Sequence, residues 1–145
     1  MNPKDKNRLA SEQGFTLIEL LVVIIIIGVL VAIAVPAYLT FSGNANKAAA
    51  QANVRSAIPA AEGYFKSNNS SYTGMTTAGL IALTPGIDSS LTTQVGGVTA
   101  GDSYCLQDTK SGKSAYYIGG MSASRMTADP GAGKVAAGTC PATLT

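Results

Sequence analysis

A long apolar segment near the N-terminus dominates the hydropathy pattern of the chain. From Phe15 to Val35 the sequence runs for 21 residues with Glu19 as its one charged side chain. At 1.5 Å per residue, a helix of this length extends for about 31 Å, which is the thickness of the hydrocarbon core of a membrane. The pattern therefore predicts a membrane-spanning helix.

The charges on either side of this segment predict its orientation. Lys4, Lys6 and Arg8 precede it, whereas only Lys47 follows it within a comparable distance. Because basic residues are retained on the cytoplasmic side, residues 1–14 are expected inside and the C-terminal part outside.

An amphipathic helical pattern follows the apolar segment, from Asn44 to Lys66. The residues expected to pack on the rest of the domain are Ala45, Ala48, Ala49, Ala52, Val54, Ile58, Ala61 and Phe65. The residues expected on the solvent-exposed face are Lys47, Gln51, Arg55, Glu62 and Lys66. Pro36 and Pro59 each remove a helical hydrogen bond and predict bends. The turn-forming residues 68–71 predict the end of the helix.

The remaining sequence predicts a short helix and a few strands. The helix is expected at Ala78–Leu83 and the strands at Gln94–Thr99, Ser103–Gln107 and Ala115–Gly119. A polar turn over Asp108–Lys113 joins the last two strands into a β-hairpin.

Composition adds two constraints on this C-terminal part. Outside the apolar segment the chain is rich in Ala, Gly, Ser and Thr, so the hydrophobic core of this part is small. Such a core needs a covalent cross-link or a binding partner for stability. Cys105 and Cys140 both follow the apolar segment, and a disulfide between them is the expected state if this part is exported. Two free buried thiols in a cytosolic protein are the alternative.

The residues offer no basis for catalysis, a cofactor or a metal. The chain has no histidine, so the commonest metal ligand and general base is absent. We find no nucleophile–base pair, phosphate loop or metal cluster, and we expect no enzyme. The acidic candidates for calcium match no coordination loop in their spacing; they are Asp88, Asp102, Asp108 and Asp129.

The net charge of +2 gives no reason to expect a nucleic-acid partner. One basic and aromatic group could form a surface for DNA capture: Lys110, Lys113, Tyr116 and Tyr117. We favour the alternative that the lysines solvate the hairpin turn while the tyrosines divide between core and surface.

The string Gly14-Phe15-Thr16-Leu17-Ile18-Glu19 lies where the charged N-terminus meets the apolar segment. A carboxylate in a membrane span costs about 2–4 kcal/mol at the centre and less near the interface, so it indicates a function or a partner. Cleavage after Gly14 would create such a partner, the α-amino group of Phe15. Pairing of this amine with Glu19, within a chain or between neighbours, would help to set axial register in a low-dielectric helix bundle.

This combination resembles the class III signal of the type IV pilin and pseudopilin family, over residues 1 to about 40. The resemblance implies cleavage between Gly14 and Phe15 by a prepilin peptidase, which also N-methylates Phe15. It implies that Glu19 contacts the Phe15 amine of an adjacent subunit during assembly. It further implies that the helix loosens between Gly28 and Pro36 in the filament.

The same resemblance implies an α+β fold. A long N-terminal helix, with a transmembrane half and an amphipathic half, packs on a small antiparallel sheet, and a disulfide between Cys105 and Cys140 closes the C-terminal loop. The expected organisation is a removed leader at 1–14, a hydrophobic helix at 15–41 and a globular head at 42–145.

The function implied is that of a structural subunit that polymerises into a type IV pilus through its N-terminal helix. Its expected partners are other subunits, the prepilin peptidase, an assembly platform and an ATPase. It is expected in the cytoplasmic membrane before assembly and outside the cell afterwards, and a nucleic-acid partner has no support.

Two alternatives stay open. A pseudopilin of type II secretion shares the N-terminal motif, although its major subunit usually has a calcium site rather than this disulfide. A small exported binding domain would instead use an ordinary signal, cleaved after Ala32-Ile33-Ala34, which leaves Glu19 unexplained.

Overall fold

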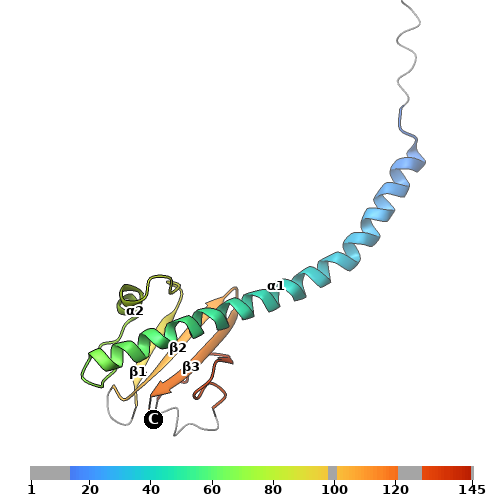
Figure 1. The fold of residues 1–145 in the computed structure, drawn as a ribbon. Helices are drawn as coiled ribbons and strands as arrows, with labels where there is room; N and C mark the ends of the chain where they lie inside the picture. Colours follow the sequence, from blue (N-terminus) through green and yellow to red (C-terminus); the bar gives the residue numbers. More distant parts are fainter. Residues whose placement is uncertain (1–13, 98–100, 121–128, 145) are drawn as a thin grey trace, which may run out of the picture. The chain divides into compact units, whose positions relative to one another are not determined.

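The structure is a computed structural model, and it describes residues 14–97, 101–120 and 129–144 (Figure 1). The chain divides into two compact units, residues 1–40 and 41–145. The expected leader lies outside the described residues up to position 13, and so does the end of the strand predicted at Gln94–Thr99.

Helix α1, Leu17–Ser67, is 51 residues long and contributes to both units. It continues through Pro36 and Pro59, as the sequence predicts. The backbone carbonyl of Pro36 accepts a hydrogen bond of 3.1 Å from the Thr40 hydroxyl. The bends expected at the two prolines stay predictions.

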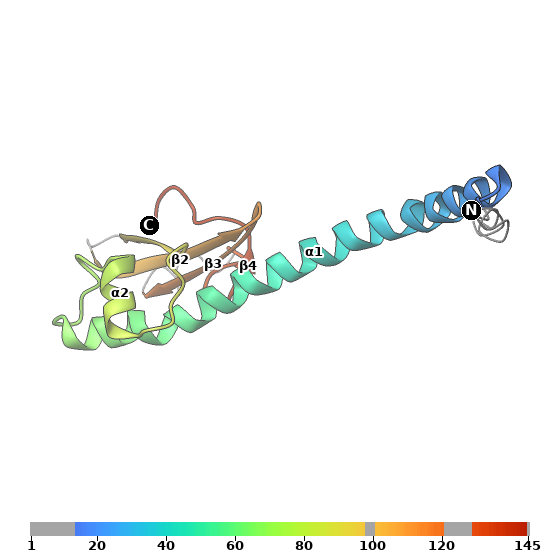
Figure 2. The same cartoon turned by 90° about the horizontal axis from the view of Figure 1, so that it is seen from above.

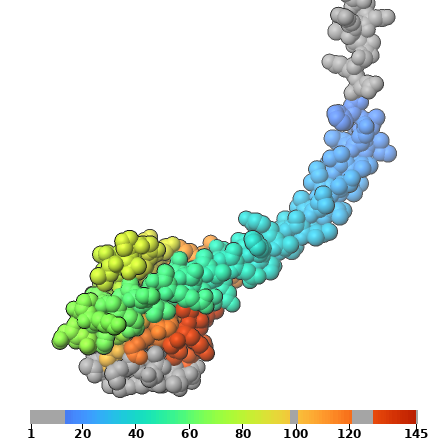
Figure 3. Space-filling model, in the orientation of Figure 1, coloured from blue at the N-terminus to red at the C-terminus, as the bar shows by residue number. Residues whose placement is uncertain are grey.

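In the first unit, every described residue from Gly14 to Thr40 is exposed. Figure 3 shows this segment as a rod one helix thick. A helix that is apolar on all sides needs an apolar environment, which a membrane or other helices can supply.

The second unit, which we call the head, is an α+β domain. Its sheet has the order β1-β2-β3-β4, with all neighbours antiparallel; the strands are β1 Thr92–Gly96, β2 Ser103–Lys110, β3 Lys113–Gly120 and β4 Ala136–Ala137. Figures 1 and 2 show the C-terminal half of α1 running along one face of this sheet. The predicted packing of a long helix on a small antiparallel sheet is confirmed.

The alanine stripe predicted to pack on the sheet is partly wrong in its phase. The residues of α1 that are buried are Ala50, Val54, Ala57, Ala60 and Ala61. Ala45, Ala48, Ala49 and Ala52 are exposed instead. At 100° per residue, positions 50, 54, 57 and 61 follow one side of the helix, while 45, 48 and 52 lie on the opposite side. A run of alanines has no hydropathy contrast that could reveal this phase.

Strands β2 and β3 are buried on both faces. Tyr104 and Leu106 belong to the cluster packed with α1, whereas Cys105 and Ile118 form a second cluster with Leu144 from the C-terminal segment. This alternation follows from the period of two residues along a strand. The C-terminal segment therefore covers the face of the sheet opposite to α1.

The predicted hairpin is confirmed, but its turn is shorter than expected. Lys110 pairs with Lys113, so the turn is Ser111 and Gly112 alone. Their φ angles of 47° and 75° are the left-handed values of a two-residue hairpin turn. The strands extend through the polar residues because backbone pairing does not require apolar side chains.

Helix α2, Thr77–Leu83, agrees with the short helix predicted at Ala78–Leu83. The hydroxyl of Thr76 caps it by accepting a hydrogen bond from the Gly79 amide. Helix α1 ends where expected, because Asn69 and Ser70 adopt φ angles of 54° and 57°.

The disulfide Cys105–Cys140 is present, with a Cα–Cα distance of 6.0 Å. It joins β2 to the C-terminal segment, and the Cys140 amide donates a 2.7 Å hydrogen bond to the Gln107 side chain. The expected closure of the C-terminal region is confirmed.

Candidate functional site

Glu19 closes the first turn of α1 together with Thr16. Its Oε2 accepts hydrogen bonds from the Thr16 amide at 2.9 Å and from the Thr16 hydroxyl at 2.7 Å. The Glu19 amide in turn donates to the Thr16 hydroxyl at 3.3 Å. This reciprocal arrangement is a capping box, which satisfies amides that a helix start otherwise leaves unpaired.

The capping role of Glu19 was missed in the sequence, although the Thr-x-x-Glu spacing was a sufficient signal for it. The carboxylate also lies at the positive end of the helix dipole. All the hydrogen bonds that the described residues give to it reach Oε2, so Oε1 is the oxygen that remains for a further donor.

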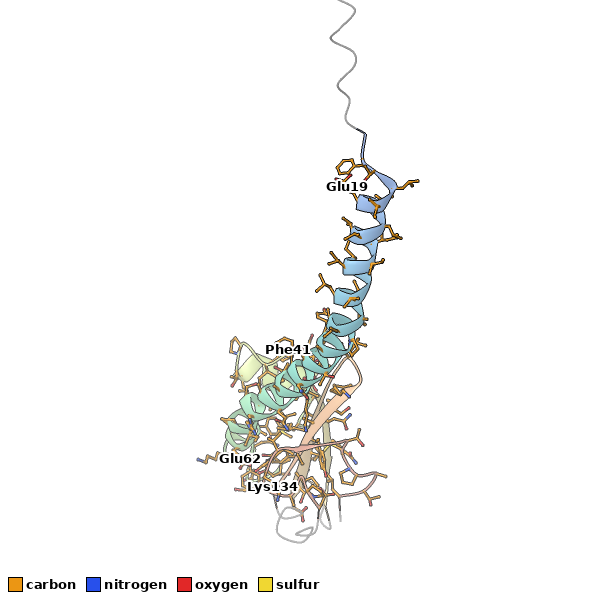
Figure 4. All side chains as sticks on the ribbon, turned by 90° about the vertical axis from the view of Figure 1, so that its right-hand side faces the viewer. Glu19, Phe41, Glu62 and Lys134 are labelled. Atoms are coloured by element: carbon orange, nitrogen blue, oxygen red, sulfur yellow. A yellow bond between two sulfur atoms is a disulfide. The ribbon has the colours of Figure 1, made fainter. Side chains whose placement is uncertain are left out.

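The apolar surface of α1 begins at this cap. Phe15 is 90% exposed, and the large apolar side chains that follow it as far as Phe41 are all about half exposed or more. Figure 4 shows side chains projecting outward along α1 between the labelled Glu19 and Phe41. Among the described residues, α1 is the one helix that is long and apolar enough to cross a membrane.

Gly28 and Pro36 both lie within regular α1 helix. A Cβ placed on Gly28 would meet no other atom within 4 Å, so packing does not require glycine there. The loosening of the helix between these residues in a filament stays a prediction, as does the processing at Gly14 and Phe15.

In the head, Glu62 joins α1 to the sheet. The prediction that it lies on the solvent-exposed face of the helix is wrong. Its carboxylate accepts hydrogen bonds from the hydroxyls of Tyr104 at 2.7 Å and Tyr72 at 3.2 Å. Burial, followed by the interaction with Glu62, raises the pKa of both tyrosines well above its usual range. Glu62, labelled in Figure 4, is half-buried and stabilises the head.

A second polar network connects α1, the segment before β1, and β2. Buried Asp108 accepts hydrogen bonds from Asn53 at 2.7 Å and from Ser90 at 2.5 Å. Lys110 forms an ion pair with Asp88 at 2.8 Å and also donates to Ser90. The hydrogen bond from Lys110 is the main reason that the pKa of Asp88 lies well below its usual range.

These contacts decide between the two interpretations of the lysines and tyrosines near the hairpin. Lys110 is engaged by Asp88, Tyr116 is buried, and Tyr117 is half-buried. They therefore form no basic and aromatic surface with Lys113.

Of the four aspartates considered for calcium, Asp88 and Asp108 share the Ser90 hydroxyl, whereas the other two have partners elsewhere. Asp102 accepts a hydrogen bond from the Ser103 hydroxyl at 2.9 Å, and Asp129 accepts one from Tyr116 at 2.5 Å. In the part of the chain that the structure describes, no three acidic, cysteine or histidine side chains are placed to hold a metal ion.

Comparison with known proteins finds a likeness in the N-terminal segment. Residues 9–35, which include the cap and most of the apolar helix, match the prokaryotic N-terminal methylation motif. In this segment, the chain is similar to proteins that carry this motif.

Two similar proteins are named as type IV pilus components. The chain is 40% identical over 53 residues to the type IV major pilin protein PilA of Myxococcus xanthus, covering 37% of this chain and 24% of that protein. It is 58% identical over 48 residues to the type IV narrow pilus major component PilA5 of Thermus thermophilus, covering 31% of this chain and 41% of that protein. The matches thus span less than half the length of either relative.

Proposed function

We propose that this chain is the structural subunit of a type IV pilus and not an enzyme. The observation that carries the proposal is the fully exposed apolar helix, which begins at the Thr16–Glu19 cap inside a methylation motif. Both relatives are named as major components of type IV pili. The apolar surface is removed from water first by the membrane and then by the helices of other subunits.

Assembly depends on a charge created at the start of the helix. Cleavage after Gly14 exposes the amine of Phe15, which is N-methylated and keeps its positive charge. Glu19 holds Thr16 of its own chain through Oε2, and its Oε1 accepts the amine of an adjacent subunit. In a low-dielectric helix bundle this ion pair sets the axial register, while the apolar side chains supply adhesion.

The wider assignment follows from this role. The precursor resides in the cytoplasmic membrane with the head outside, and the filament is extracellular. The partners are other copies of the chain, a prepilin peptidase that cleaves after Gly14, a platform protein and an ATPase. Gly28 and Pro36 are the positions at which α1 loosens in the filament.

The variant Glu19→Gln tests the role of the charge. Glutamine can still form a capping box, so membrane insertion and processing are expected to persist. Filament yield, measured by electron microscopy of sheared cells, is expected to fall by at least about tenfold because the ion pair is lost.

Thr16→Ala is the matched control, because it removes the cap and keeps the carboxylate. It is expected to retain filaments. Normal filaments from Glu19→Gln would contradict the proposed pairing. The intact mass of the filament subunit gives a second test: a chain that starts at methylated Phe15 supports the proposal, and one that starts near Val35 overturns it.

A further inference from the structure

The head has a pocket of about 420 Å³ with two lysines in its wall. Lys47 comes from α1 and Lys113 from the start of β3. The other lining residues are small or hydroxylated: Gly112, Ser114, Ala137, Gly138 and Thr139. The aliphatic stem of Lys113 lies against α1, since its Cε is 3.5 Å from the place a Cβ would occupy on Gly43.

Among the residues that the structure describes, neither lysine has an anionic partner. The one ion pair that the described residues form is Lys110–Asp88. The described carboxylates of the head all have hydrogen-bond partners elsewhere: Glu62, Asp88, Asp102, Asp108 and Asp129. The two lysines therefore present positive charge that no described carboxylate of the same head neutralises. An external anion is therefore the better match.

The position of Lys47 along α1 indicates which anion is at hand. Tyr38 and Phe41 are 69% and 73% exposed at the end of the apolar segment, where aromatic side chains commonly mark a membrane interface. Lys47 follows Phe41 by six residues, which is about 9 Å along a helix. A lysine side chain can extend toward the interface over several of these ångströms, so lipid phosphates come within its reach.

We propose that the Lys47–Lys113 pocket binds the phosphate of an anionic phospholipid headgroup, such as phosphatidylglycerol, while the subunit is in the membrane. The two ammonium groups donate to the phosphate oxygens, and the hydroxyl of Thr139, which lines the same pocket, faces the headgroup glycerol. The inference rests on the membrane-spanning part of the proposed function and is independent of polymerisation.

The test uses the full chain in phosphatidylcholine micelles, titrated with short-chain phosphatidylglycerol. Amide resonances of Gly112, Ser114 and Thr139 are expected to shift in a saturable way. A lysine near an anionic surface contributes about fivefold to affinity. The double variant Lys47→Gln/Lys113→Gln is therefore expected to weaken binding by about 25-fold.

The matched control is Arg55→Gln/Lys66→Gln, which removes the same charge from exposed positions of α1 outside the pocket. It is expected to keep its affinity within about twofold, because these residues do not touch the ligand. Equal losses in both double variants would indicate diffuse attraction and overturn the site. Unchanged affinity in Lys47→Gln/Lys113→Gln would overturn it as well.

Two further measurements distinguish a lipid ligand from a free phosphate and from a second copy of the chain. If soluble glycerol 3-phosphate binds as tightly as phosphatidylglycerol and depends on the same lysines, the ligand is a free phosphate and the lipid assignment is wrong. If the chain associates with itself without anionic lipid, and the lysine variant abolishes this association, the occupant is a second copy and the proposal is wrong. The filament yield of Glu19→Gln tests polymerisation alone. The proposed function and the proposed lipid site can therefore be contradicted independently of each other.

Discussion

The two units of this chain use the same helix in opposite ways. From Gly14 to Thr40 no side chain is buried, whereas in the head the helix buries Ala50, Val54 and Ala57 against its own sheet. Helical hydrogen bonds are local in both parts. The first part must find its apolar contacts in a membrane or in other copies, and the second finds them within the chain.

The comparison also explains why the head contains covalent and polar links. Its helix contributes mainly alanines to the core, and each alanine buries little apolar area. The disulfide between Cys105 and Cys140 and the hydrogen bonds of Glu62 supplement this small core. The described part of the first unit buries no side chains, so it has no core that such links could supplement.

Removal of the disulfide is expected to have the largest effect on the head. The bond closes a loop with a sequence separation of 35, for which the chain-entropy estimate is about 4 kcal/mol. Cys105→Ser/Cys140→Ser should lower the free energy of unfolding by about this amount in urea denaturation. Membrane insertion should not change, and a head of unaltered stability would contradict the role assigned to the bond.

A matched pair of leucine truncations compares the two units directly. Leu106 is fully buried and Leu30 is 61% exposed. Leu106→Ala should destabilise the head by about 2–5 kcal/mol because it leaves a cavity. Leu30→Ala should leave the free energy of unfolding of the head unchanged. Urea denaturation of both variants under the same conditions measures this. Similar losses in both variants would mean that the two units do not unfold independently.

Alkaline pH should affect the head through its two buried tyrosines. The pKa values of Tyr72 and Tyr104 are raised in the folded state by burial and by Glu62. Their contribution to the free energy of unfolding is therefore complete at pH values below the pKa of tyrosine in the unfolded chain, which is about 10. It decreases as pH rises above that pKa. Thermal unfolding followed together with tyrosinate absorbance should show both groups ionising as the head unfolds. Ionisation of all five tyrosines of the head while it stays folded would contradict this.

Acidic pH should have the smallest effect, through the ion pair of Asp88 with Lys110. The pKa of Asp88 is lowered in the folded state, chiefly by its hydrogen bond from Lys110. Its contribution to the free energy of unfolding is thus present at pH values above the pKa of aspartate in the unfolded chain, which is about 4. It is lost as pH falls below that pKa. Lys110→Gln should flatten this part of the stability profile, whereas Lys134→Gln should not. The effect is small because both side chains are solvated.

Much of the architecture could be predicted because several signals are strong and local. The apolar segment, the turn residues at 68–71 and the alternating pattern around Cys105 and Ile118 each identify an element without reference to the rest of the chain. The pairing of Cys105 with Cys140 followed once export was inferred. The N-terminal motif likewise needs only consecutive residues, which is why it indicated the family.

Other features depended on contacts that the linear sequence does not record. Strand β4 is two alanines long and exists because it pairs with β3. Glu62 looks solvated on a helical wheel, yet two tyrosines from distant segments bring it into the head. Lys47 and Lys113 lie 66 positions apart by their numbers and share a pocket only after the hairpin packs near α1.

By itself, the sequence determined the apolar helix and its terminal charge, because hydropathy and consecutive spacing are properties of neighbouring residues. The tertiary structure decided which alanines face the sheet, since an alanine run is equally compatible with every phase of a helix. It also decided which charged groups of the described head form an ion pair and which do not. That outcome depends on distances between segments, and folding alone creates those distances.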